Sequence, residues 1–381
     1  MRIAIVGAGP AGLYASILIK RLRPQAEVRV LEQNPADATF GFGVVFSDQA
    51  LAFLRDDDPE TADLIEARMT HWSDIAVVHR GERIAIDGIG FSGIGRLELL
   101  MLLQERARAL GVEPDYELRL ESPTELADAD LIIGADGLNS VLRGAAPEAF
   151  GEEITYLENR FIWYGAERAF EALTQTFIET PLGPMNAHHY AYAPGRATFI
   201  IEMTAETFGR SGFAEMAEPD YRAACEALFA ESLQGARLIP NNSVWRRFPE
   251  LTCRNWHHGR QVLVGDALHT AHFSIGSGTR LALEDVIALV KALQAEDWEV
   301  ERALPAYQAA RQPVLEKILQ AAARSAAWYE DFDRHMALEP WPFALSYIRR
   351  AGRLDAERLR SLAPRFAAAL EEKGISLEAA A

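Results

Sequence analysis

Residues 1–32 read MRIAIVGAGPAGLYASILIKRLRPQAEVRVLE, and they specify the architecture with which this 381-residue chain begins. The opening run, residues 2–6, is apolar and rich in β-branched side chains, as buried parallel strands are. A glycine-bearing turn, a helical run over 13–22 and a second apolar run over 27–31 follow it. A strand, a helix and a second strand in this order predict a βαβ unit of a doubly wound α/β fold.

The turn between the first strand and the helix is a GxGxxG sequence, Gly7-Ala8-Gly9-Pro10-Ala11-Gly12. Gly7 allows a tight turn, Gly9 lets the backbone approach a pyrophosphate, and Gly12 lets the helix pack closely on the strand. The helix N-terminus presents free N–H groups and partial positive charge to phosphates. Glu32 ends the second strand, where a carboxylate can accept hydrogen bonds from ribose hydroxyls. Glycines also punctuate ordinary turns, but the complete context predicts a bound dinucleotide.

Composition narrows the class of protein. The chain is 49% hydrophobic and long enough for two packed domains or for one large domain with an inserted layer. A net charge of −17 argues against a nucleic-acid partner, because phosphate backbones need clustered Lys and Arg. Cys225 and Cys253 have neither CxxC nor paired His/Cys spacing, so neither a metal site nor a disulfide framework is expected.

The first residues also bear on localisation. Met1-Arg2 leads directly into the first strand and leaves no room for a signal peptide, so a cytoplasmic protein is expected. The longest apolar stretch, near residues 3–19, is interrupted by glycines and a proline and carries the nucleotide motif. It is therefore not expected to span a membrane.

An aromatic, glycine-bearing segment, FGFGVVFS at 40–47, follows Glu32. Its composition suits a loop that passes close to a flat ligand, and a plain loop with a short strand has equal weight. Surface helices are expected over 48–54 and 59–69, and the alternation over 75–86 around Arg80-Gly81-Glu82 predicts an antiparallel hairpin. An apolar helix is expected over 97–110, between Gly95-Arg96 and Gly111.

Two later strands end in an acidic residue. The run over 130–134 leads into Asp136-Gly137, which puts a carboxylate at the carboxyl end of a strand, where doubly wound sheets bind ligands. The run over 261–264 leads into Gly265-Asp266, which taken alone could be a capped turn. Gly276 and Gly278 precede a helix expected over 279–293, and they let a ligand's carbonyl edge meet its positive end.

The middle of the chain changes pattern. Residues 154–203 alternate between aromatic and polar, as in FIWYG at 161–165, and predict a second, antiparallel sheet that forms one wall of a substrate pocket. Residues 300–381 read as helical. The basic run at 349–365 is expected to be helical, with a solvated face as its simplest explanation.

Three motifs carry a family resemblance. GAGPAG with Glu32, GADGLNSVLR at 134–143 and VGDALHTAHFSIGSGTRLALEDVIAL at 264–289 resemble the single-component FAD-dependent aromatic hydroxylases of the p-hydroxybenzoate hydroxylase type. The resemblance covers roughly residues 1–330. Within that group, FGFGVVFS, FIWYG and GDALHTAHFSIGSGT are most similar to the salicylyl-CoA 5-hydroxylases and to the monooxygenase half of 2-aminobenzoyl-CoA monooxygenase/reductase. The tryptophan hydroxylases of violacein biosynthesis are also similar.

The resemblance implies a GxGxxG-type FAD-binding doubly wound fold with an inserted antiparallel β-sheet substrate layer and C-terminal helices. It assigns 1–72, 96–153 and 260–299 to the FAD-binding domain, 73–95 and 154–259 to the substrate layer, and 300–381 to the helical C-terminal region. No second GxGxxG follows residue 32, so the nicotinamide is expected to visit the flavin without a domain of its own.

The resemblance also implies roles for individual residues. Glu32 and the glycines of the first motif hold the ADP half of FAD, Asp136 lies near the pyrophosphate, and Asp266 binds the ribityl chain. Arg96 reaches the cofactor, and the helix that opens near Gly278 faces the flavin N1/C2 carbonyl edge. The expected FAD contacts are Gly7, Gly9, Pro10, Ala11, Gly12, Glu32, Gln33, Val44, Val45, Arg96, Asp136, Gly265, Asp266, Gly276, Gly278 and Thr279.

The implied reaction is hydroxylation of an aromatic ring with O2 and NADH or NADPH through a C4a-hydroperoxyflavin. The expected substrate is an ortho-substituted benzoyl-CoA, such as salicylyl-CoA converted to gentisyl-CoA, and a free aromatic acid or an indole is the nearer alternative. A non-catalytic FAD-binding redox sensor is the alternative of another class. A flavin-dependent halogenase is disfavoured, because Trp245-Arg246-Arg247-Phe248 does not fit WxWxIP. A monomer or a homodimer is expected.

Substrate contacts are expected on the antiparallel layer and on the loop before the 279–293 helix. A base that takes a proton from the ring substituent would be one of three histidines, of which His272 and His188 are chosen over His189. A purely structural role is the alternative for each. The expected aromatic contacts are Phe46, Trp163, Tyr190, Tyr192 and Phe273.

Two features bear on how the substrate is held. Phe273 stands where the family usually has proline and Arg280 where it has asparagine, so the substrate geometry of relatives does not transfer. Arg246 and Arg247 are expected to bind the phosphates of a CoA tail, together with the nearby Arg254 and Arg260. Surface ion pairs are the alternative for these arginines.

Overall fold

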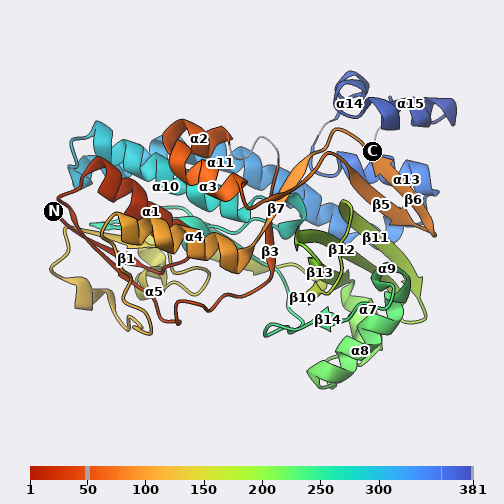
Figure 1. Cartoon of the computed structure of the whole chain (residues 1–381), viewed down its shortest axis with the longest axis horizontal. Coiled ribbons are helices and arrows are strands. Elements are labelled where there is room, and N and C mark those ends of the chain that lie inside the picture. Colours follow the sequence, from red (N-terminus) through yellow and green to blue (C-terminus); the bar gives the residue numbers. More distant parts are fainter. Residues whose placement is uncertain (48–51, 353, 379–381) are drawn as a thin grey trace.

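The computed structural model describes residues 1–47, 52–352 and 354–378, which are built around two large sheets (Figure 1). The first sheet has five strands in the order β16-β17-β8-β1-β2. Its strands are β1 (Arg2–Val6), β2 (Glu27–Leu31), β8 (Leu131–Gly134), β16 (His257–His258) and β17 (Gln261–Leu263). All neighbours pair in parallel except β16, which is antiparallel at one edge. The doubly wound α/β core predicted from the first 32 residues is confirmed.

Helices cover this sheet where the sequence predicts them. α1 (Pro10–Leu22) begins inside the glycine turn, α4 (Arg96–Ala109) fills the predicted 97–110 helix, and α10 (Gly278–Ala295) fills the predicted 279–293 helix. α1 packs against both α4 and α10 and buries Leu13, Tyr14 and Ile17 in a first hydrophobic core. The short helices α5 (Val141–Ala145) and α6 (Pro147–Phe150) and the 3-10 turns η2 (Pro123–Leu126) and η3 (Gly265–Ala267) lie in its connections.

The second sheet has seven strands in the order β14-β10-β13-β12-β11-β5-β6. Its members are β5 (Ile75–His79), β6 (Glu82–Ile86), β10 (Arg160–Ala166), β11 (Leu173–Thr180), β12 (Gly183–Ala193), β13 (Arg196–Met203) and β14 (Leu238–Ile239). The predicted 75–86 hairpin is β5 and β6, and its turn residues Arg80 (φ 51°) and Gly81 (φ 77°) have the left-handed geometry of a two-residue hairpin loop. α7 (Ala205–Ser211), α8 (Glu218–Leu228) and α9 (Ala230–Leu233) lie beside this sheet (Figure 1).

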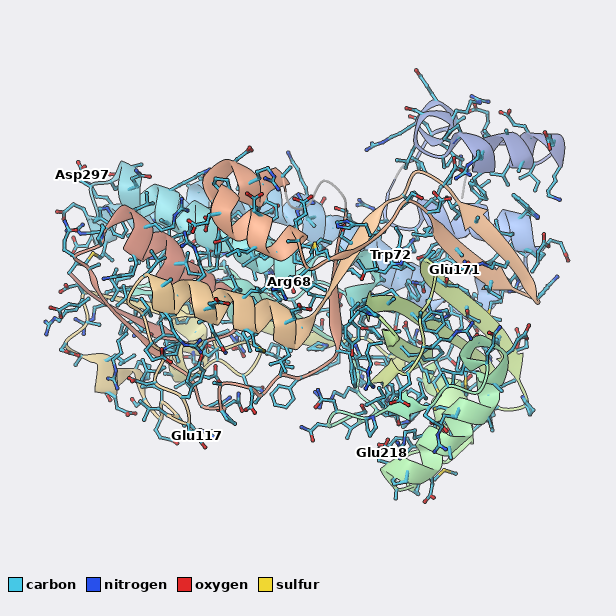
Figure 2. All side chains as sticks on the ribbon, viewed as in Figure 1. Arg68, Trp72, Glu117, Glu171, Glu218 and Asp297 are labelled. Carbon is cyan, nitrogen blue, oxygen red and sulfur yellow. The ribbon has the colours of Figure 1, made fainter. Side chains whose placement is uncertain are left out.

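Two small sheets connect these layers. β3 (Gly43–Ser47) and β4 (Thr70–Trp72) both pair with β7 (Phe91–Gly95), and β9 (Glu152–Tyr156) pairs with β15 (Pro249–Cys253). Trp72 lies between the two halves of the molecule (Figure 2), where its ring meets that of Tyr190 edge-on with centroids 6.1 Å apart. β3, in the segment predicted to pass a flat ligand, contacts β12 of the seven-stranded sheet.

The long helix α11 (Val300–Glu330) joins both halves. Near its start Leu304 and Tyr307 belong to the first core, and near its end Trp328 and Tyr329 pack in a second core with Phe177 of β11. The helices that follow are α12 (Phe332–His335), α13 (Pro340–Arg349), α14 (Ala356–Leu362) and α15 (Pro364–Glu372). They cover one end of the seven-stranded sheet (Figure 1).

Some expected helix bounds need correction. The helix predicted over 59–69 ends earlier, as α3 (Pro59–Glu66), and the 48–54 prediction falls largely on residues outside the described part, with α2 (Ala52–Asp57) following. The basic 349–365 run is not one helix, because α13 ends at Arg349 and α14 begins after the capping carboxylate of Asp355. Its apolar members Ala356 and Leu359 are buried, so it is not simply a solvated face.

Among the described residues, no helix is long and apolar enough to cross a lipid bilayer. The domain boundaries expected from the sequence stay a prediction.

Candidate active site

The first glycine motif forms a cradle whose open side suits a pyrophosphate. A Cβ on Gly7 (φ 98°) would lie 2.4 Å from the Ala135 carbonyl oxygen, and one on Gly12 would lie 1.9 Å from the Gly7 carbonyl oxygen. A Cβ on Gly9 would meet no protein atom within 4 Å. Gly7 and Gly12 are thus required for packing, whereas Gly9 keeps space open beside the uncapped N-terminus of α1.

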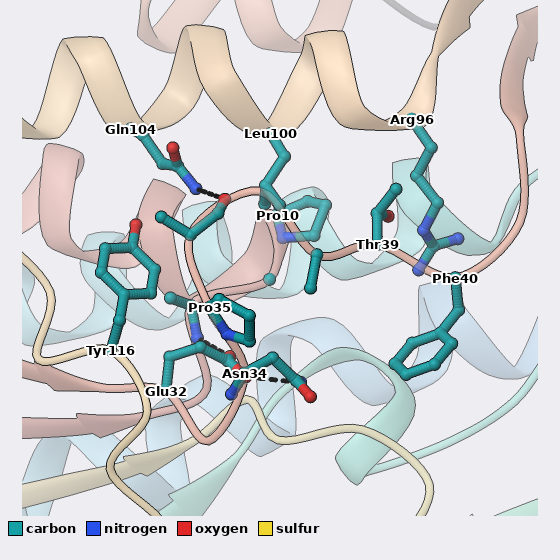
Figure 3. A pocket seen from close by; sticks show the side chains of 14 residues that line it. Pro10, Glu32, Asn34, Pro35, Thr39, Phe40, Arg96, Leu100, Gln104 and Tyr116 are labelled. Atoms are coloured by element: carbon teal, nitrogen blue, oxygen red, sulfur yellow. Dashed lines mark hydrogen bonds between the residues drawn. The ribbon is translucent and has the colours of Figure 1, made fainter.

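Glu32 borders a pocket that opens from this cradle (Figure 3). Its carboxylate accepts hydrogen bonds from the backbone N–H of Ala8 at 2.8 Å and from the Asn34 side chain at 2.7 Å. Asn34 lines the pocket in place of the neighbouring Gln33, which is exposed and outside the lining. Pro10 of the predicted set also lines it. Glu32 therefore ties the end of β2 to the glycine turn at the position where a ribose would lie.

Arg96 lies in the same pocket and begins α4. Its backbone N–H donates to the Phe42 carbonyl at 2.7 Å, and no side-chain hydrogen bond or ion pair of its guanidinium is found among the described residues. The positive charge of Arg96 acts on Asp266, where it offsets part of the rise in pKa that burial causes. Figure 3 shows the Arg96 side chain directed down from α4 toward Phe40. Arg96 is therefore placed to meet an anionic part of a bound cofactor.

Asp136 follows β8 and has a buried atom without a partner. Its Oδ2 accepts from the Val141 N–H at 2.7 Å, while its Oδ1 is buried and accepts no hydrogen bond from any described residue. Burial raises the pKa of Asp136. Arg143 is buried beside it and donates to the Ala267 carbonyl at 2.6 Å, which joins the second motif to the third. A hydroxyl or water beside a bound dinucleotide would satisfy Asp136 Oδ1.

A network of buried charged side chains holds the Gly265-Asp266 turn in place. Gly265 (φ 59°) donates its N–H to Asp285 Oδ2 at 3.1 Å. Asp285 also bonds His269 Nε2 at 2.7 Å and Arg311 Nε at 2.9 Å. Although burial opposes ionisation, His269 and Arg311 hold the pKa of Asp285 below its ordinary value. Asp266, the next residue, is exposed to solvent, and the protein atoms packed around its carboxyl raise the pKa of that group.

The N-terminus of α10 has the open donors that a carbonyl edge requires. Ser277 precedes Gly278 without a side-chain cap, and its Oγ is buried with no partner among the described residues. Gly276 (φ 62°) allows close approach of β3, because a Cβ there would lie 2.8 Å from Val45 Cγ2. Thr279 lies in the first turn of α10. Val45 thus borders the helix start, while its neighbour Val44 is buried in the first core.

Three of the aromatic residues predicted to line the substrate pocket lie along the 41–45 segment, and their contact with substrate stays a prediction. Tyr190 donates its hydroxyl to the Gly43 carbonyl at 2.8 Å, and Tyr192 packs against Gly43 and Gly95. Trp163 packs near Gly41, and its buried Nε1 has no acceptor among the described residues. These side chains hold the 41–45 segment on the sheet. Phe46 does not join them, because β3 alternates and turns Phe46 into the first core, where it is fully buried.

The two chosen histidines meet around Phe273. The Phe273 ring lies 5.3 Å from His188, 4.2 Å from His272 and 4.9 Å from Phe161. Burial and the charge of Arg350 lower the pKa of both His188 and His272 to about 3, and the two imidazoles also oppose each other's protonation. Both rings are therefore neutral at pH 7 and better suited to accept a hydrogen bond than to keep a proton.

The third candidate lies elsewhere. His189 points to the opposite face of β12, where it stacks on Phe199 at 5.1 Å in the core under α8.

The four arginines considered for a CoA tail contact different elements. Arg247 donates to the Leu157 and Tyr156 carbonyls at 2.7 Å each and pairs with Glu158. Arg254 pairs with Glu153 at 3.8 Å, and Arg260 donates to the Ala127 carbonyl at 2.8 Å. Arg246 is exposed, and no side-chain partner for it is found in the described part of the chain. The ion-pair alternative describes Arg247 and Arg254, and Arg246 alone keeps a free guanidinium.

A buried acid lies beside the aromatic wall and was not expected from the sequence. Glu202 on β13 is 2% exposed and accepts from Asn159 Nδ2 at 2.9 Å. Asn186, its partner across the β12–β13 ladder, has a buried Nδ2 without an acceptor among the described residues. Burial raises the pKa of Glu202 to about 8, so its carboxyl is largely protonated at pH 7. Asn159, Asn186 and Glu202 form a polar floor next to Phe161.

Sequence reasoning also missed Asp285, Arg311 and Arg350. Asp285 and Arg311 lie at buried positions of α10 and α11, and a charged residue on the apolar face of an expected helix is the signal that could have found them. Arg350 belongs to the basic 349–365 run, and nothing in that run distinguishes it as the arginine that contacts Ser274, next to Phe273.

The glycine cradle, the acid-ended strands and the uncapped helices define a protein that binds a dinucleotide such as FAD. Residues 98–322 match the family model described as FAD binding domain. The salicyloyl-CoA 5-hydroxylase of Streptomyces sp is 39% identical over 361 residues, which cover 92% of this chain and 70% of that protein. A 3-hydroxy-4-methyl-anthranilyl-[aryl-carrier protein] 5-monooxygenase of Streptosporangium sibiricum is 38% identical over 86% of this chain and 89% of its own.

A structural likeness agrees with these sequence relationships. The tetrameric form of 2-methyl-3-hydroxypyridine-5-carboxylic acid oxygenase superposes with a TM-score of 0.69 at 20% identity, over 92% of this chain and 95% of that one. At that identity the likeness shows the fold alone. The chain belongs to the FAD-dependent aromatic monooxygenases, and its cofactor is FAD. When bound, FAD supplies the oxygen activation, with NAD(P)H as the reductant of this family.

Proposed function

We propose that this enzyme hydroxylates an ortho-substituted benzoyl thioester such as salicylyl-CoA, at the ring position para to the ortho substituent. The identity to two relatives carries the proposal, since their names specify a salicyloyl and an anthranilyl thioester, both oxidised at position 5. A hydroxyl or amino group activates the para carbon toward an electrophilic oxygen. Oxidation of salicylyl-CoA at that carbon would give gentisyl-CoA.

The overall reaction consumes one O2 and one NAD(P)H, places one oxygen atom on the ring and releases the other as water. The chain's own part is to hold FAD along the cradle of Gly9 and Glu32, to position the ring and to exclude water. Phe273, with His188 and His272 around it, is the group proposed to contact the ring. Glu202, opposite Phe161 in the β10–β13 ladder, contributes a protonated carboxyl.

A second substrate class has one supporting observation. Protodeoxyviolaceinate monooxygenase of Chromobacterium violaceum is 31% identical over 92% of this chain and 94% of that protein, which keeps an indole-type substrate as the alternative. A free aromatic acid remains the other alternative. We further propose a cytoplasmic enzyme, where NAD(P)H is supplied, acting as a monomer or homodimer.

Substrate-stimulated oxidation of NAD(P)H tests the proposal. The holoenzyme is mixed with NADH or NADPH and then with salicylyl-CoA, 2-aminobenzoyl-CoA, salicylate or tryptophan. Salicylyl-CoA should raise the rate of oxidation far above that with salicylate. Equal stimulation by both would remove the thioester and leave the hydroxylase. No stimulation by any aromatic compound would favour the redox-sensor reading instead.

A further inference from the structure

Arg350 is a cation at the substrate side of the fold that lies outside both the matched family region and the three sequence motifs. It directly follows α13, and its Nη2 donates to the Ser274 carbonyl at 2.9 Å. Its Nη1 donates to the Tyr347 carbonyl at 2.9 Å, and the guanidinium carbon lies 3.8 Å from the centre of the Tyr347 ring. Arg350 is thus held in place by two carbonyls and an aromatic face.

No carboxylate in the described part of the chain pairs with this cation. Among the described residues no ion pair involves Arg350, and its Nε is buried without an acceptor. A guanidinium has five N–H donors, and the two carbonyls account for only two of them. A half-buried charge with unused donors is unfavourable unless an anion or a polarised oxygen completes it. The unused donors therefore indicate a missing oxygen ligand.

The surroundings of Arg350 place that ligand beside the predicted ring site. Ser274 belongs to η4 (Phe273–Ile275), whose Phe273 packs between His188 and His272. The charge of Arg350 acts on both imidazoles. The rings of Tyr329 and Tyr347 also lie beside the guanidinium of Arg350. Arg350 therefore places a positive charge beside this group of neutral side chains.

We infer that Arg350 binds the ortho oxygen of the substrate as a phenolate, together with the adjacent acyl carbonyl oxygen. The inference rests on the proposed function and narrows its substrate to ortho-hydroxybenzoyl compounds. A salicyl group presents these two oxygens side by side, as a planar guanidinium fork requires. The ortho O–H bond breaks on binding, its electron pair stays on oxygen, and the proton passes to bulk water.

This arrangement is consistent with neutral imidazoles at His188 and His272. His188 and His272 need not keep the proton, because Arg350 stabilises the phenolate charge directly. The phenolate donates electron density to the para carbon, which is the position proposed for hydroxylation. An ortho-amino group has no anionic form in water and offers N–H donors toward a cation, so Arg350 should discriminate against 2-aminobenzoyl substrates.

Ligand binding to the FAD-loaded enzyme, without NAD(P)H, tests this assignment. Salicylyl-CoA, 2-aminobenzoyl-CoA, benzoyl-CoA and free salicylate are titrated while the ultraviolet spectrum of the bound ligand is recorded. The wild type should bind salicylyl-CoA most tightly and shift its absorption to that of the phenolate at pH 7. Arg350→Gln should weaken salicylyl-CoA binding by about 10- to 100-fold and abolish the shift, the scale of a lost charge-assisted hydrogen bond.

Control ligands and variants separate this inference from the proposed function. Benzoyl-CoA, which lacks the ortho oxygen, should bind Arg350→Gln and wild type within about threefold of each other, a difference below one hydrogen bond. Arg324→Gln removes a nearby guanidinium that donates to the Ala351 carbonyl, and it should leave the phenolate shift intact. Arg350→Lys should keep part of the affinity and lose the two-oxygen selectivity. FAD content is measured for every variant.

An unchanged phenolate shift in Arg350→Gln would overturn the inference and leave the thioester proposal standing. Tighter binding of 2-aminobenzoyl-CoA than of salicylyl-CoA by the wild type would also overturn it. If only free salicylate binds, the thioester claim fails, and the same shift with salicylate decides the role of Arg350. If none of the four compounds binds, both the proposed function and the inference fail.

Discussion

His269 and Asp285 are joined by a 2.7 Å hydrogen bond between Nε2 and Oδ2, and both side chains are almost completely buried. The same carboxylate receives Arg311 and the N–H of Gly265. The carboxyl end of β17 is thereby fixed to α10, and the turn that carries Asp266 keeps its left-handed glycine. Removing one partner of a buried charge pair lowers the free energy of unfolding by more than the intact pair contributes to it, because the remaining charge is buried without compensation.

Asp285→Asn should therefore destabilise the protein strongly. The variant removes one of the two carboxylates that pair with the buried Arg311, leaving Glu284, and it removes the anionic partner of His269, so the free energy of unfolding should fall by about 2–4 kcal/mol. Glu105→Gln, on the exposed side of α4, is the control and should change it little. Chemical denaturation of both variants measures the difference. Equal stability of Asp285→Asn and wild type would show that the network does not hold the turn.

The pH dependence of Asp285 follows from its lowered pKa. A carboxyl whose folded pKa lies below its unfolded pKa contributes stability that is present above the unfolded value and lost as pH falls through the folded one. The cost of Asp285→Asn should therefore shrink in acid.

The raised pKa of Glu202 predicts the opposite dependence of stability on pH. Its pKa of about 8 lies above the ordinary value, so its contribution is favourable below the unfolded pKa and is lost as pH rises toward 8. Glu202→Gln keeps the hydrogen bond with Asn159 and cannot ionise. The variant should therefore gain stability relative to wild type between pH 5 and pH 9 by on the order of 2–4 kcal/mol. Thermal melts across that range measure the gain, and parallel curves for both proteins would contradict the burial of an ionisable acid here.

The glycine cradle predicts two different failures from one added methyl group. Gly9 has an extended backbone and free space around it, so Gly9→Ala should fold normally and bind FAD about tenfold more weakly or worse, because the methyl blocks the pyrophosphate. Gly12→Ala puts its Cβ 1.9 Å from the Gly7 carbonyl oxygen and should lower stability instead. Melting of the FAD-free proteins and FAD titration separate the two. A normal FAD affinity of Gly9→Ala would place the pyrophosphate elsewhere.

Arg246 offers a test of the CoA tail. It is exposed and has no side-chain partner in the described part of the chain, so Arg246→Ala should raise the apparent KM for salicylyl-CoA several-fold, as loss of a phosphate contact does. The rate at saturating thioester should stay unchanged, because a contact to the tail phosphates binds the substrate and the transition state equally. Arg247→Ala is the matched variant and should reduce stability, because Arg247 is tied to two backbone carbonyls. An unchanged KM in Arg246→Ala would remove Arg246 from the thioester path.

Short sequence motifs were enough to predict the glycine cradle and the 75–86 hairpin. The features that the sequence did not predict depend on contacts between residues far apart in the chain. The GxGxxG spacing, the acid-ended strands and the Arg80-Gly81 turn are each fixed by a few adjacent residues. The face of Phe46 could not be predicted, because Val44, Val45 and Phe46 are all apolar and alternation gives no sign of which side is the core. Gly352 and the capping Asp355 marked the break in the basic 349–365 run.

The charged members of the site depend on pairs far apart in the chain. Arg350 meets Ser274 across 76 residues, and Asn159 meets Glu202 across 43. Nothing local to Arg350 distinguishes it from its basic neighbours. Only the folded position of α13 against η4 gives it a role.

Oxygen-isotope labelling tests the central claim most directly. The FAD-loaded enzyme is supplied with NAD(P)H, salicylyl-CoA and ¹⁸O2 in unlabelled water, and the product is analysed by mass spectrometry. The monooxygenase assignment predicts a ring-hydroxylated thioester that carries one ¹⁸O atom on the carbon para to the ortho oxygen. A product whose new oxygen comes from water, or NAD(P)H oxidation that yields only peroxide with every aromatic substrate, would contradict it.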